Sequence, residues 1–249
     1  MMLLYFCSLF GLIAGLLIGA AGIGGVILVP LLVYFADIDI HTSIAASVAA
    51  FFVSGLVGTI TYSKRGVIRW QDFIAVSTGA LPGALLGAYV LPKIESYFLT
   101  LFIALVLMVS AVKQFTGTKS SNPSRPTQNI PKYQLALVGL VTGFLSVLSG
   151  TGGPLVLLPL LNLLSMPLIT AIGLSQVIQL PIATFASIGN AVNSLIDWEL
   201  VMVLSFGLAF GSFIGAKGSE RFPIAHIKML VSILLFLSGA YMVTTLLFG

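Results

Sequence analysis

The stretch from Tyr133 to Ile196 contains no Asp, Glu, Lys or Arg. About 20 apolar residues cross a bilayer as a helix, so this stretch alone is long enough for about three crossings. In the whole chain 58% of residues are hydrophobic and only 7% are charged, whereas about a quarter are charged in a typical soluble domain. The sequence therefore predicts an all-α, polytopic membrane protein whose surface is covered mainly by lipid.

The uncharged start of the chain, residues 1–36, is interpreted as part of the same membrane domain. A secretory signal peptide has a basic start and a short apolar stretch, but here the apolar run is long and no Lys or Arg precedes Lys64. Cys7 is the only cysteine, which excludes an intramolecular disulfide. The net charge of +4 comes from basic residues in short loops, a pattern that indicates membrane topology and not nucleic-acid binding.

The two halves of the chain match each other at an offset of 128 residues. The two tryptophans of the sequence, Trp70 and Trp198, form one matched pair, and both halves contain a G-x-G-G motif. Other matched pairs are Gly11 and Gly139, Gly15 and Gly143, Ser47 and Ser175, Gly79 and Gly207, Gly83 and Gly211, and Gly87 and Gly215. Paired rare residues together with a shared glycine motif indicate an internal duplication.

Each repeat is expected to contain four hydrophobic segments, the first of which is interrupted by glycine. The expected segments are residues 3–36, 44–63, 73–92 and 96–115 in the first repeat, and 133–164, 171–194, 200–216 and 228–248 in the second. Residues 117–131 are rich in Ser, Asn, Pro and basic residues, a composition typical of a loop. The predicted organisation is a first membrane repeat (1–116), this linker, and a second membrane repeat (132–249).

The loop charges predict that the two repeats have inverted topology. One loop of the first repeat carries Lys64, Arg65 and Arg69, whereas its counterpart in the second repeat carries Asp197 and Glu199. Because Lys and Arg concentrate on the cytoplasmic side of a membrane, these equivalent loops should lie on opposite faces. The N-terminus is then outside and the linker is cytoplasmic. A simple eight-span protein with parallel repeats would need loop charges of the same sign in both halves.

Inverted repeats require an odd number of crossings in each half. Three ordinary spans follow the glycine-broken segment, so that segment has to cross an even number of times, as a re-entrant hairpin or as two short helices. We favour the hairpin because only about 11 apolar residues lie between Gly25 and Asp37, too few to span a bilayer at 1.5 Å per residue.

Two glycine breaks at matching places in inverted repeats are the best sequence indicator of a carrier's binding site. Pro154 suits the first turn of a helix, and that helix would direct free N–H groups and the positive end of its dipole toward the break, where they attract anions. We therefore expect a small anion near the middle of the membrane, between two helix starts. The candidate substrate-binding residues are Gly22, Ile23, Gly24, Gly25, Ser149, Gly150, Thr151, Gly152, Gly153, Ser47, Ser175, Gln176 and Gln179.

Polar residues follow one side of the second span in each repeat. They are Ser43, Ser47, Ser54, Gly58 and Thr61 in the first repeat, and Gln176, Gln179, Asn190 and Asn193 in the second. Exposing such groups to lipid is costly, so we expect them to face the interior and to line the path. The alternative is a structural role, because membrane Ser and Thr often bond their own helix backbone and glycines at four-residue spacing let helices pack closely.

Apart from Lys113 and Lys228, near the ends of two segments, the expected spans contain no charged residue. A charge at mid-membrane costs about 2.5–3.5 kcal/mol on insertion scales, and without a buried carboxylate a metal-cation carrier or a proton pump has little support. Both histidines lie in loops, and the sequence has no H-E-x-x-H or G-x-S-x-G motif. We therefore expect no enzymatic activity, no cofactor and no metal.

The glycine-rich first segment continues into the apolar sequence VILVPLL, and its repeat reads SGTGGPLVLLPLL. These motifs, the plan of four plus four hydrophobic segments and the total length resemble the sulfite exporter TauE/SafE family. The resemblance covers essentially the whole chain. It implies a permease of the bacterial or archaeal cytoplasmic membrane that moves sulfite, sulfoacetate or other organosulfonates, with Gly22–Gly25 and Gly150–Gly153 as the signature positions.

The leading hypothesis is a secondary transporter that moves a small sulfur-containing anion, with export by alternating access. The alternatives are an anion channel, a carrier for another small carboxylate or oxyanion, and a non-transporting membrane scaffold. The expected partners are a small anionic solute and the lipid bilayer, and not nucleic acid. The sequence leaves open a homo-oligomer and a coupling proton or other ion.

Overall fold

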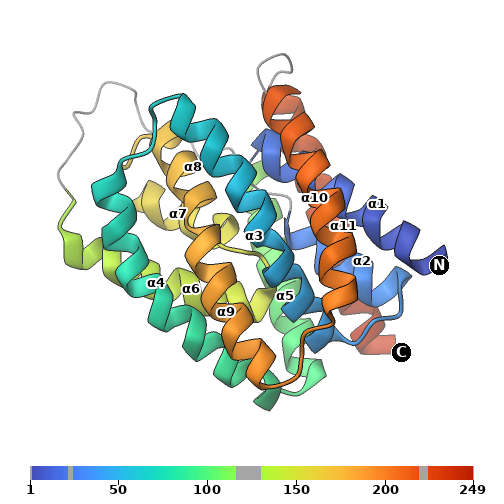
Figure 1. Ribbon diagram of the computed structural model, residues 1–249. Helices are drawn as coiled ribbons and strands as arrows, with labels where there is room; N and C mark the ends of the chain where they lie inside the picture. Colours follow the sequence, from blue (N-terminus) through green and yellow to red (C-terminus); the bar gives the residue numbers. More distant parts are fainter. Residues whose placement is uncertain (1, 22–24, 116–129, 219–223, 249) are drawn as a thin grey trace.

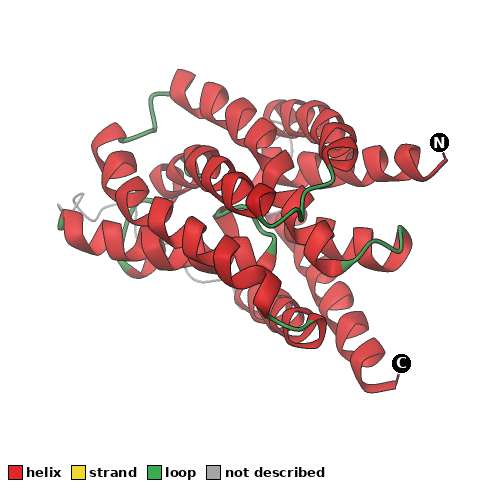
Figure 2. Ribbon diagram, turned by 60° about the horizontal axis from the view of Figure 1, so that its bottom comes forward, coloured by secondary structure: helices red, strands yellow, loops and turns green. Residues whose placement is uncertain are grey.

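The computed structural model describes residues 2–21, 25–115, 130–218 and 224–248 (Figure 1). The helices are α1 (Met2–Ala21), α2 (Leu28–Phe35), α3 (Ile40–Lys64), α4 (Trp70–Val90), α5 (Ser96–Phe115), α6 (Lys132–Ser149), α7 (Pro154–Leu163), α8 (Leu168–Val177), α9 (Gln179–Val192), α10 (Trp198–Gly218) and α11 (Ile224–Phe248). Short 3-10 turns, Gly25–Ile27 and Leu91–Lys93, precede α2 and follow α4. These described segments contain no strand, and Figure 2 shows helices joined by short loops.

By length and apolar composition, five helical stretches in the described residues can cross a membrane, with α8 and α9 counted as one. The five are Ile40–Lys64, Trp70–Lys93, Lys132–Ser149, Leu168–Val192 and Trp198–Gly218. Shorter apolar stretches lie in α1, α5 and α11. The prediction of an all-α, polytopic membrane protein is confirmed, and each expected span coincides with a helix or a helix pair.

Each glycine-broken segment forms a long helix followed by a short one. Helix α1 has 20 residues and α6 has 18, whereas α2 has 8 and α7 has 10. At 1.5 Å per residue, α2 and α7 extend only about 12–15 Å, which is too short to cross a membrane. The first helix of each pair, α1 or α6, approaches the length of a full span, and only the second is short.

Glycines bring α1 against α10 and α4 against α6. The contacts are Gly11 to Leu204, Gly15 to Leu208 and Gly19 to Ser212 in the first pair, and Gly79 to Ala136, Gly83 to Leu140 and Gly87 to Phe144 in the second. Residue numbers rise together in both pairs, so the paired helices are parallel. A Cβ atom at these positions would meet the partner's backbone, which explains why glycine is needed there. Each pair joins the first helix of one repeat to the third span of the other.

Helix α3 and its counterpart α8–α9 lie against each other and run in opposite directions (Figure 1). Along α3, Ser54 contacts Gln179 and Gly58 contacts Gln176, so residue numbers rise in one helix as they fall in the other. These segments are equivalent at the offset of 128 residues. Antiparallel equivalents are the relation that an inverted repeat requires.

The charged side chains gather at two opposite ends of the helices. Arg65 ends α3 beside the end of α10, where its Nη2 donates to the Ala216 carbonyl at 3.3 Å. His41 begins α3 beside the end of α4, with Nε2 2.9 Å from the Ile94 carbonyl. We call the first end the basic face and the second the acidic face. The basic face carries Lys64, Arg65, Arg69 and Lys217 together with Asp72, and the acidic face carries Asp37, Asp39, Glu95, Asp197 and Glu199 together with Lys93.

Helices α1 and α2 begin and end at the same face. Helix α1 is parallel to α10, which ends at the basic face, so α1 runs from the acidic face toward the basic face. Helix α2 leads into Asp37 at the acidic face, and the Tyr34 hydroxyl lies 2.9 Å from the Thr245 hydroxyl near the end of α11. The two helices thus have the course of a hairpin that opens toward the acidic face.

Candidate functional site

The second chain break, between α6 and α7, is built from three glycines with positive φ. Gly150 ends α6 in the left-handed conformation at φ 64°, and the Thr151 N–H donates to the Ser146 carbonyl at 3.1 Å, which satisfies the last turn of the helix. Gly152 and Gly153 follow with φ of 72° and 121°. Residues with a Cβ atom rarely adopt these backbone conformations, so the turn itself requires glycine.

Helix α7 begins at this break and leaves backbone donors unused. Pro154 occupies its first turn and has no N–H group to leave unpaired. Within the described part of the chain, the N–H groups of Gly152, Gly153 and Leu155 donate no hydrogen bond. Free N–H groups and the positive end of the helix dipole together favour a negative ligand.

The two hydroxyls at this break bond within the protein. Ser149 Oγ lies 2.7 Å from the Leu145 carbonyl of its own helix and 3.1 Å from Thr151 Oγ1. Both side chains are buried. The sequence allowed Ser149 either to contact a ligand or to bond its own helix backbone, and in this conformation it bonds its own backbone. Its second contact is with the Thr151 hydroxyl at the break.

The first break lies mostly outside the described residues. Gly22, Ile23 and Gly24, all candidate substrate-binding residues, are among the residues that the structure does not describe. Gly25 is described and is buried in the 3-10 turn that leads into α2. A Cβ atom on Gly25 would lie 2.6 Å from Cζ of Phe51, so this glycine is in direct contact with an aromatic ring of α3.

One face of α3 packs against both breaks. A Cβ atom on Gly152 would lie 2.5 Å from Cδ2 of Phe51, and one on Gly150 would lie 3.5 Å from Ile44. Ser47 lies between Ile44 and Phe51 on the same side of the helix. Its side chain is buried, and its hydroxyl has no hydrogen-bond partner among the described residues. The structure therefore places the candidate Ser47 beside the breaks.

Phe51 is a central residue that the sequence did not single out. An apolar side chain in an apolar span carries no polar or glycine signal. The one available indication was the offset of 128 residues, at which Phe51 corresponds to the candidate Gln179.

Two glutamines of the second repeat form a buried chain of hydrogen bonds with α3. Ser54 Oγ donates to Gln179 Oε1 at 2.9 Å, and Gln179 Nε2 donates to Gln176 Oε1 at 3.1 Å. Gln176 is only 1% exposed, and its Nε2 has no acceptor in the described structure. Gly55 and Gly58 of α3 leave the space in which these side chains lie. The unused group is a donor, so it calls for an acceptor such as an anion oxygen.

A kink in the second repeat lies between the two glutamines. Helix α8 ends at Val177 and α9 begins at Gln179. Pro181 has no N–H group and cannot donate to the Val177 carbonyl four residues earlier, which is the usual cause of such a break. Gln176 and Gln179 therefore lie on opposite sides of a kink and not along one regular helix. Ile178, at the kink, contacts Gly153 of the break.

The remaining polar candidates have different environments. Ser175 is buried and bonds its own helix at the Ile172 carbonyl, 2.8 Å away. Thr61 bonds its own backbone as well. Asn190 is buried, as expected. The expectation that Asn193 faces the interior is wrong: it lies exposed at the end of α9, where its amide donates to the Gly189 carbonyl at 2.9 Å.

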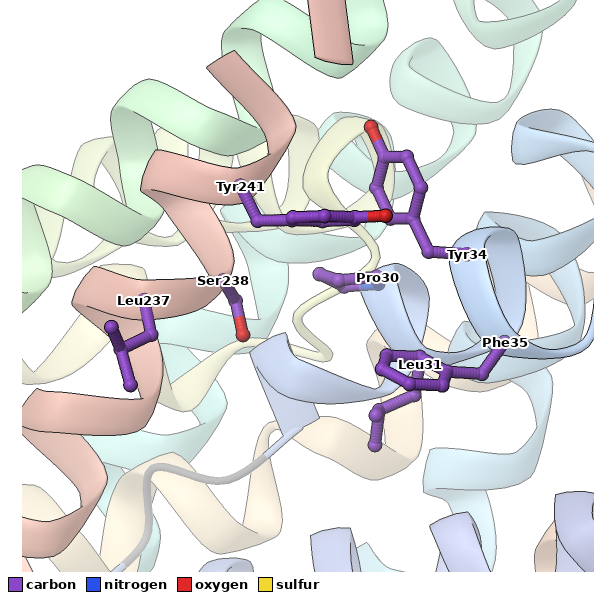
Figure 3. Close-up of a pocket in the computed structure, with 7 residues that line it drawn as sticks. All are labelled: Pro30, Leu31, Tyr34, Phe35, Leu237, Ser238 and Tyr241. Atoms are coloured by element: carbon purple, nitrogen blue, oxygen red, sulfur yellow. The ribbon is translucent and has the colours of Figure 1, made fainter. Parts of the chain in front are cut away.

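A groove of about 180 Å³ lies between α2 and α11, away from the predicted site (Figure 3). It is lined by Pro30, Leu31, Tyr34, Phe35, Leu237, Ser238 and Tyr241. The Tyr34 and Tyr241 rings meet edge to face with centroids 5.0 Å apart. None of the candidate substrate-binding residues lines this groove. Among the described residues, no three His, Cys, Asp or Glu side chains gather where they could hold a metal ion.

The chain has relatives among probable membrane transporter proteins. Probable membrane transporter protein YunE of Bacillus subtilis (strain 168) is 24% identical, with 94% of each chain covered. YdhB, a second probable membrane transporter protein of that organism, is 26% identical over 92% of this chain and 94% of its own length. A third, from Methanocaldococcus jannaschii, is 22% identical over 97% of this chain and 96% of its own. No solved structure shows significant similarity to the chain.

The family assignment rests on most of the sequence. The family model described as sulfite exporter TauE/SafE matches residues 7–242, a range that includes both breaks, α3 and the two glutamines. The chain therefore belongs to the sulfite exporter TauE/SafE family.

Proposed function

We propose that this protein is a secondary transporter for small sulfur-containing anions, such as sulfite or an organosulfonate, and that it exports them by alternating access. Membrane transport in general follows from the family and from the transporter relatives. The finer proposal depends mainly on one observation: the start of α7 has unused backbone donors, and the break before it packs against the face of α3 that carries the buried, unpartnered hydroxyl of Ser47.

The donors available at this site are electrically neutral. They are the N–H groups of Gly152, Gly153 and Leu155 and the hydroxyl of Ser47, and the amide of Gln176 lies farther along α3, against Gly58. Oxyanions such as sulfite and sulfonates present several acceptor oxygens to such donors, and a helix N-terminus adds a favourable dipole. Neutral donors also avoid the cost of keeping a bare cation in the membrane when the site is empty.

The orientation that we propose follows from the two charged faces. Basic side chains concentrate on the cytoplasmic side of membrane proteins, so the basic face is assigned to the cytoplasm and the acidic face to the outside. Helix α1 begins at the acidic face, which places the N-terminus outside and the linker 117–131 in the cytoplasm.

The proposal is tested by anion flux in proteoliposomes that contain the purified protein. Sulfite flux is expected to saturate, to be accelerated by sulfite on the opposite side, and to exceed the fluxes of sulfate and acetate. Flux without saturation or acceleration would indicate a channel instead. Preference for acetate would indicate a carboxylate carrier, and absence of any flux would support a non-transporting scaffold.

A matched pair of variants connects the flux to the site. Gln176→Ala should lower sulfite flux about tenfold, because a donor hydrogen bond to a charged group is worth about 1.5–3 kcal/mol. Gln71→Ala removes the same side chain from an exposed position at the start of α4 and should leave the flux unchanged. Equal flux in both variants would show that Gln176 has no role in transport.

A further inference from the structure

The ring of Phe51 fills the space between the two chain breaks. Phe51 is 0% exposed. The ring tip faces Gly25 of the first break, since a Cβ there would lie 2.6 Å from Cζ. The base of the same ring faces Gly152 of the second break, since a Cβ there would lie 2.5 Å from Cδ2 and 2.9 Å from Cγ. One side chain thus contacts a signature glycine from each repeat.

The position of this ring conflicts with an anion at the same place. The donors of Gly152 and Gly153 are free, yet the Phe51 ring covers Gly152. The ring fills this space with carbon and hydrogen atoms and brings no hydrogen-bond donor for an anion. An anion between the breaks and the ring in its present position therefore exclude each other.

We propose that Phe51 closes the substrate site and sets the size of the anion that the site accepts. This inference rests on the proposed function. In the closed form the ring occupies the space between the breaks, and rotation about χ1, which has two common values in helices, moves it away and admits the anion. Ser47, one turn earlier on α3, and the free N–H groups of α7 then become accessible together.

The ring also separates the two sets of donors. The breaks and Ser47 lie on one side of Phe51, and Ser54 with its glutamine partners begins on the next turn of α3. The Ser54 hydroxyl lies 3.1 Å from the Phe51 carbonyl, so the amide chain starts at the residue that carries the ring. A moving ring at this point connects the central donors with the donors between α3 and α8–α9.

The first experiment measures access without any transport assay. In a Cys7→Ser background, Ser47→Cys is labelled with a small anionic methanethiosulfonate that carries a sulfonate group. A minor conformation is typically populated at about 0.1–10%, so removing the ring with Phe51→Ala should raise the labelling rate about tenfold or more. Phe52→Ala is the matched control, because Phe52 is the neighbouring phenylalanine and is 43% exposed. Equal labelling rates in the two variants would overturn the proposal.

The second experiment measures specificity. Phe51→Ala should raise the ratio of benzenesulfonate flux to sulfite flux about tenfold, a change of 1.4 kcal/mol in relative barrier height, whereas Phe52→Ala should leave the ratio of the wild type. Since Phe-to-Ala changes in packed cores are strongly destabilising, Phe51→Leu is measured as well, with thermal unfolding in detergent as the folding check. Phe51→Leu should give a ratio between those of the wild type and Phe51→Ala, and a wild-type ratio in both variants would contradict the proposal.

The two experiments separate this inference from the proposed function. If the wild type carries no sulfite or sulfonate, the proposed function fails, and the labelling rates still decide whether Phe51 closes the site. If the wild type carries sulfite but the Phe51 variants match Phe52→Ala in both measurements, the proposed function stands and the role of Phe51 is wrong.

Discussion

The middle of α3 and the joint between α8 and α9 are equivalent positions in the two repeats, but they carry different side chains. Phe51 in α3 corresponds to Gln179 in α9 at the offset of 128 residues. The phenyl ring lies against both chain breaks, whereas the amide takes part in a buried chain of hydrogen bonds with Ser54 and Gln176. The glycine-lined packing of the two halves matches, so the scaffold is symmetrical at these positions while the centre is asymmetrical.

The two equivalent helices also differ in continuity. Helix α3 is unbroken over its 25 residues, whereas its counterpart is divided at Ile178. Pro181 accounts for the division, and the matching residue in the first repeat is Val53, which has an N–H group and lets the helix continue. One repeat thus supplies a rigid rod with an apolar side chain at its centre, and the other supplies a kinked helix with amides.

The comparison of equivalent positions would lose its basis if the two repeats did not have opposite orientations in the membrane. Single cysteines at Lys64 and Asp197, in a Cys7→Ser background, should react with a membrane-impermeant thiol reagent from opposite sides of the membrane. The expected result is all-or-none, because the two positions lie on the basic and acidic faces. Right-side-out and inside-out vesicles measure it, and labelling of both positions from one side would refute the inverted arrangement.

The asymmetry of the centre predicts that Gln179 cannot be replaced by the side chain of its counterpart. Gln179→Phe removes the acceptor of Ser54 and the donor to Gln176 and adds a ring where Gly55 leaves little space. Sulfite flux should fall about 100-fold, which corresponds to 2.7 kcal/mol in the barrier. Gln71→Phe, at an exposed position, is the control, and similar flux in the two variants would show that the asymmetry has no functional role.

The symmetry of the scaffold predicts equal effects at equivalent glycines. Gly83→Ala and Gly211→Ala each place a Cβ against the backbone of the paired helix, at Leu140 and Leu12. Each should lower the free energy of unfolding by about 2 kcal/mol, within the usual range for overpacking. Gly173→Ala is the control, since its Cβ would meet side-chain atoms at 3.3 Å or more. Thermal unfolding in detergent gives the values, and a large difference between Gly83 and Gly211 would contradict the symmetry.

The smallest expected effect concerns the hydrogen bond that joins the two unlike centres. Ser54→Ala removes the 2.9 Å bond to Gln179 and should cost about 0.6 kcal/mol, the average for hydrogen bonds between membrane helices. Thr59→Val is the control, because the Thr59 hydroxyl bonds the Gly55 carbonyl of its own helix. Unfolding in detergent measures both variants, and an equal loss of stability in Ser54→Ala and Thr59→Val would contradict the prediction.

The scaffold could be predicted from the sequence because its signals are periodic and local. Apolar length marks the spans, and glycines at four-residue spacing mark surfaces of close helix contact, as at Gly79 and Gly83. The identity of the contacting helix could not be predicted, since Ala136 and Leu140 of α6 look like any other apolar surface. The lengths of α1 and α6 were left open, because a glycine break is compatible with a hairpin and with two short helices.

The surroundings of the candidate site residues could be predicted in part, whereas their role stays a prediction. Positive φ at Gly150, Gly152 and Gly153 agrees with the reading of that motif as a turn. Buried Gln176 and Gln179 agree with the expected cost of exposing amides to lipid. Phe51 could not be found in this way, because its importance comes from where two distant breaks meet and not from its own chemistry.

The exchange of partners between the repeats has a consequence for how such a chain can arise. The glycines of α1 pack against α10, and the glycines of α4 pack against α6, so each repeat covers helix surfaces of the other. A protein consisting of one half would leave close-packing faces bare, and a second copy inserted upside down would cover them. Separately expressed halves should accordingly assemble with each other.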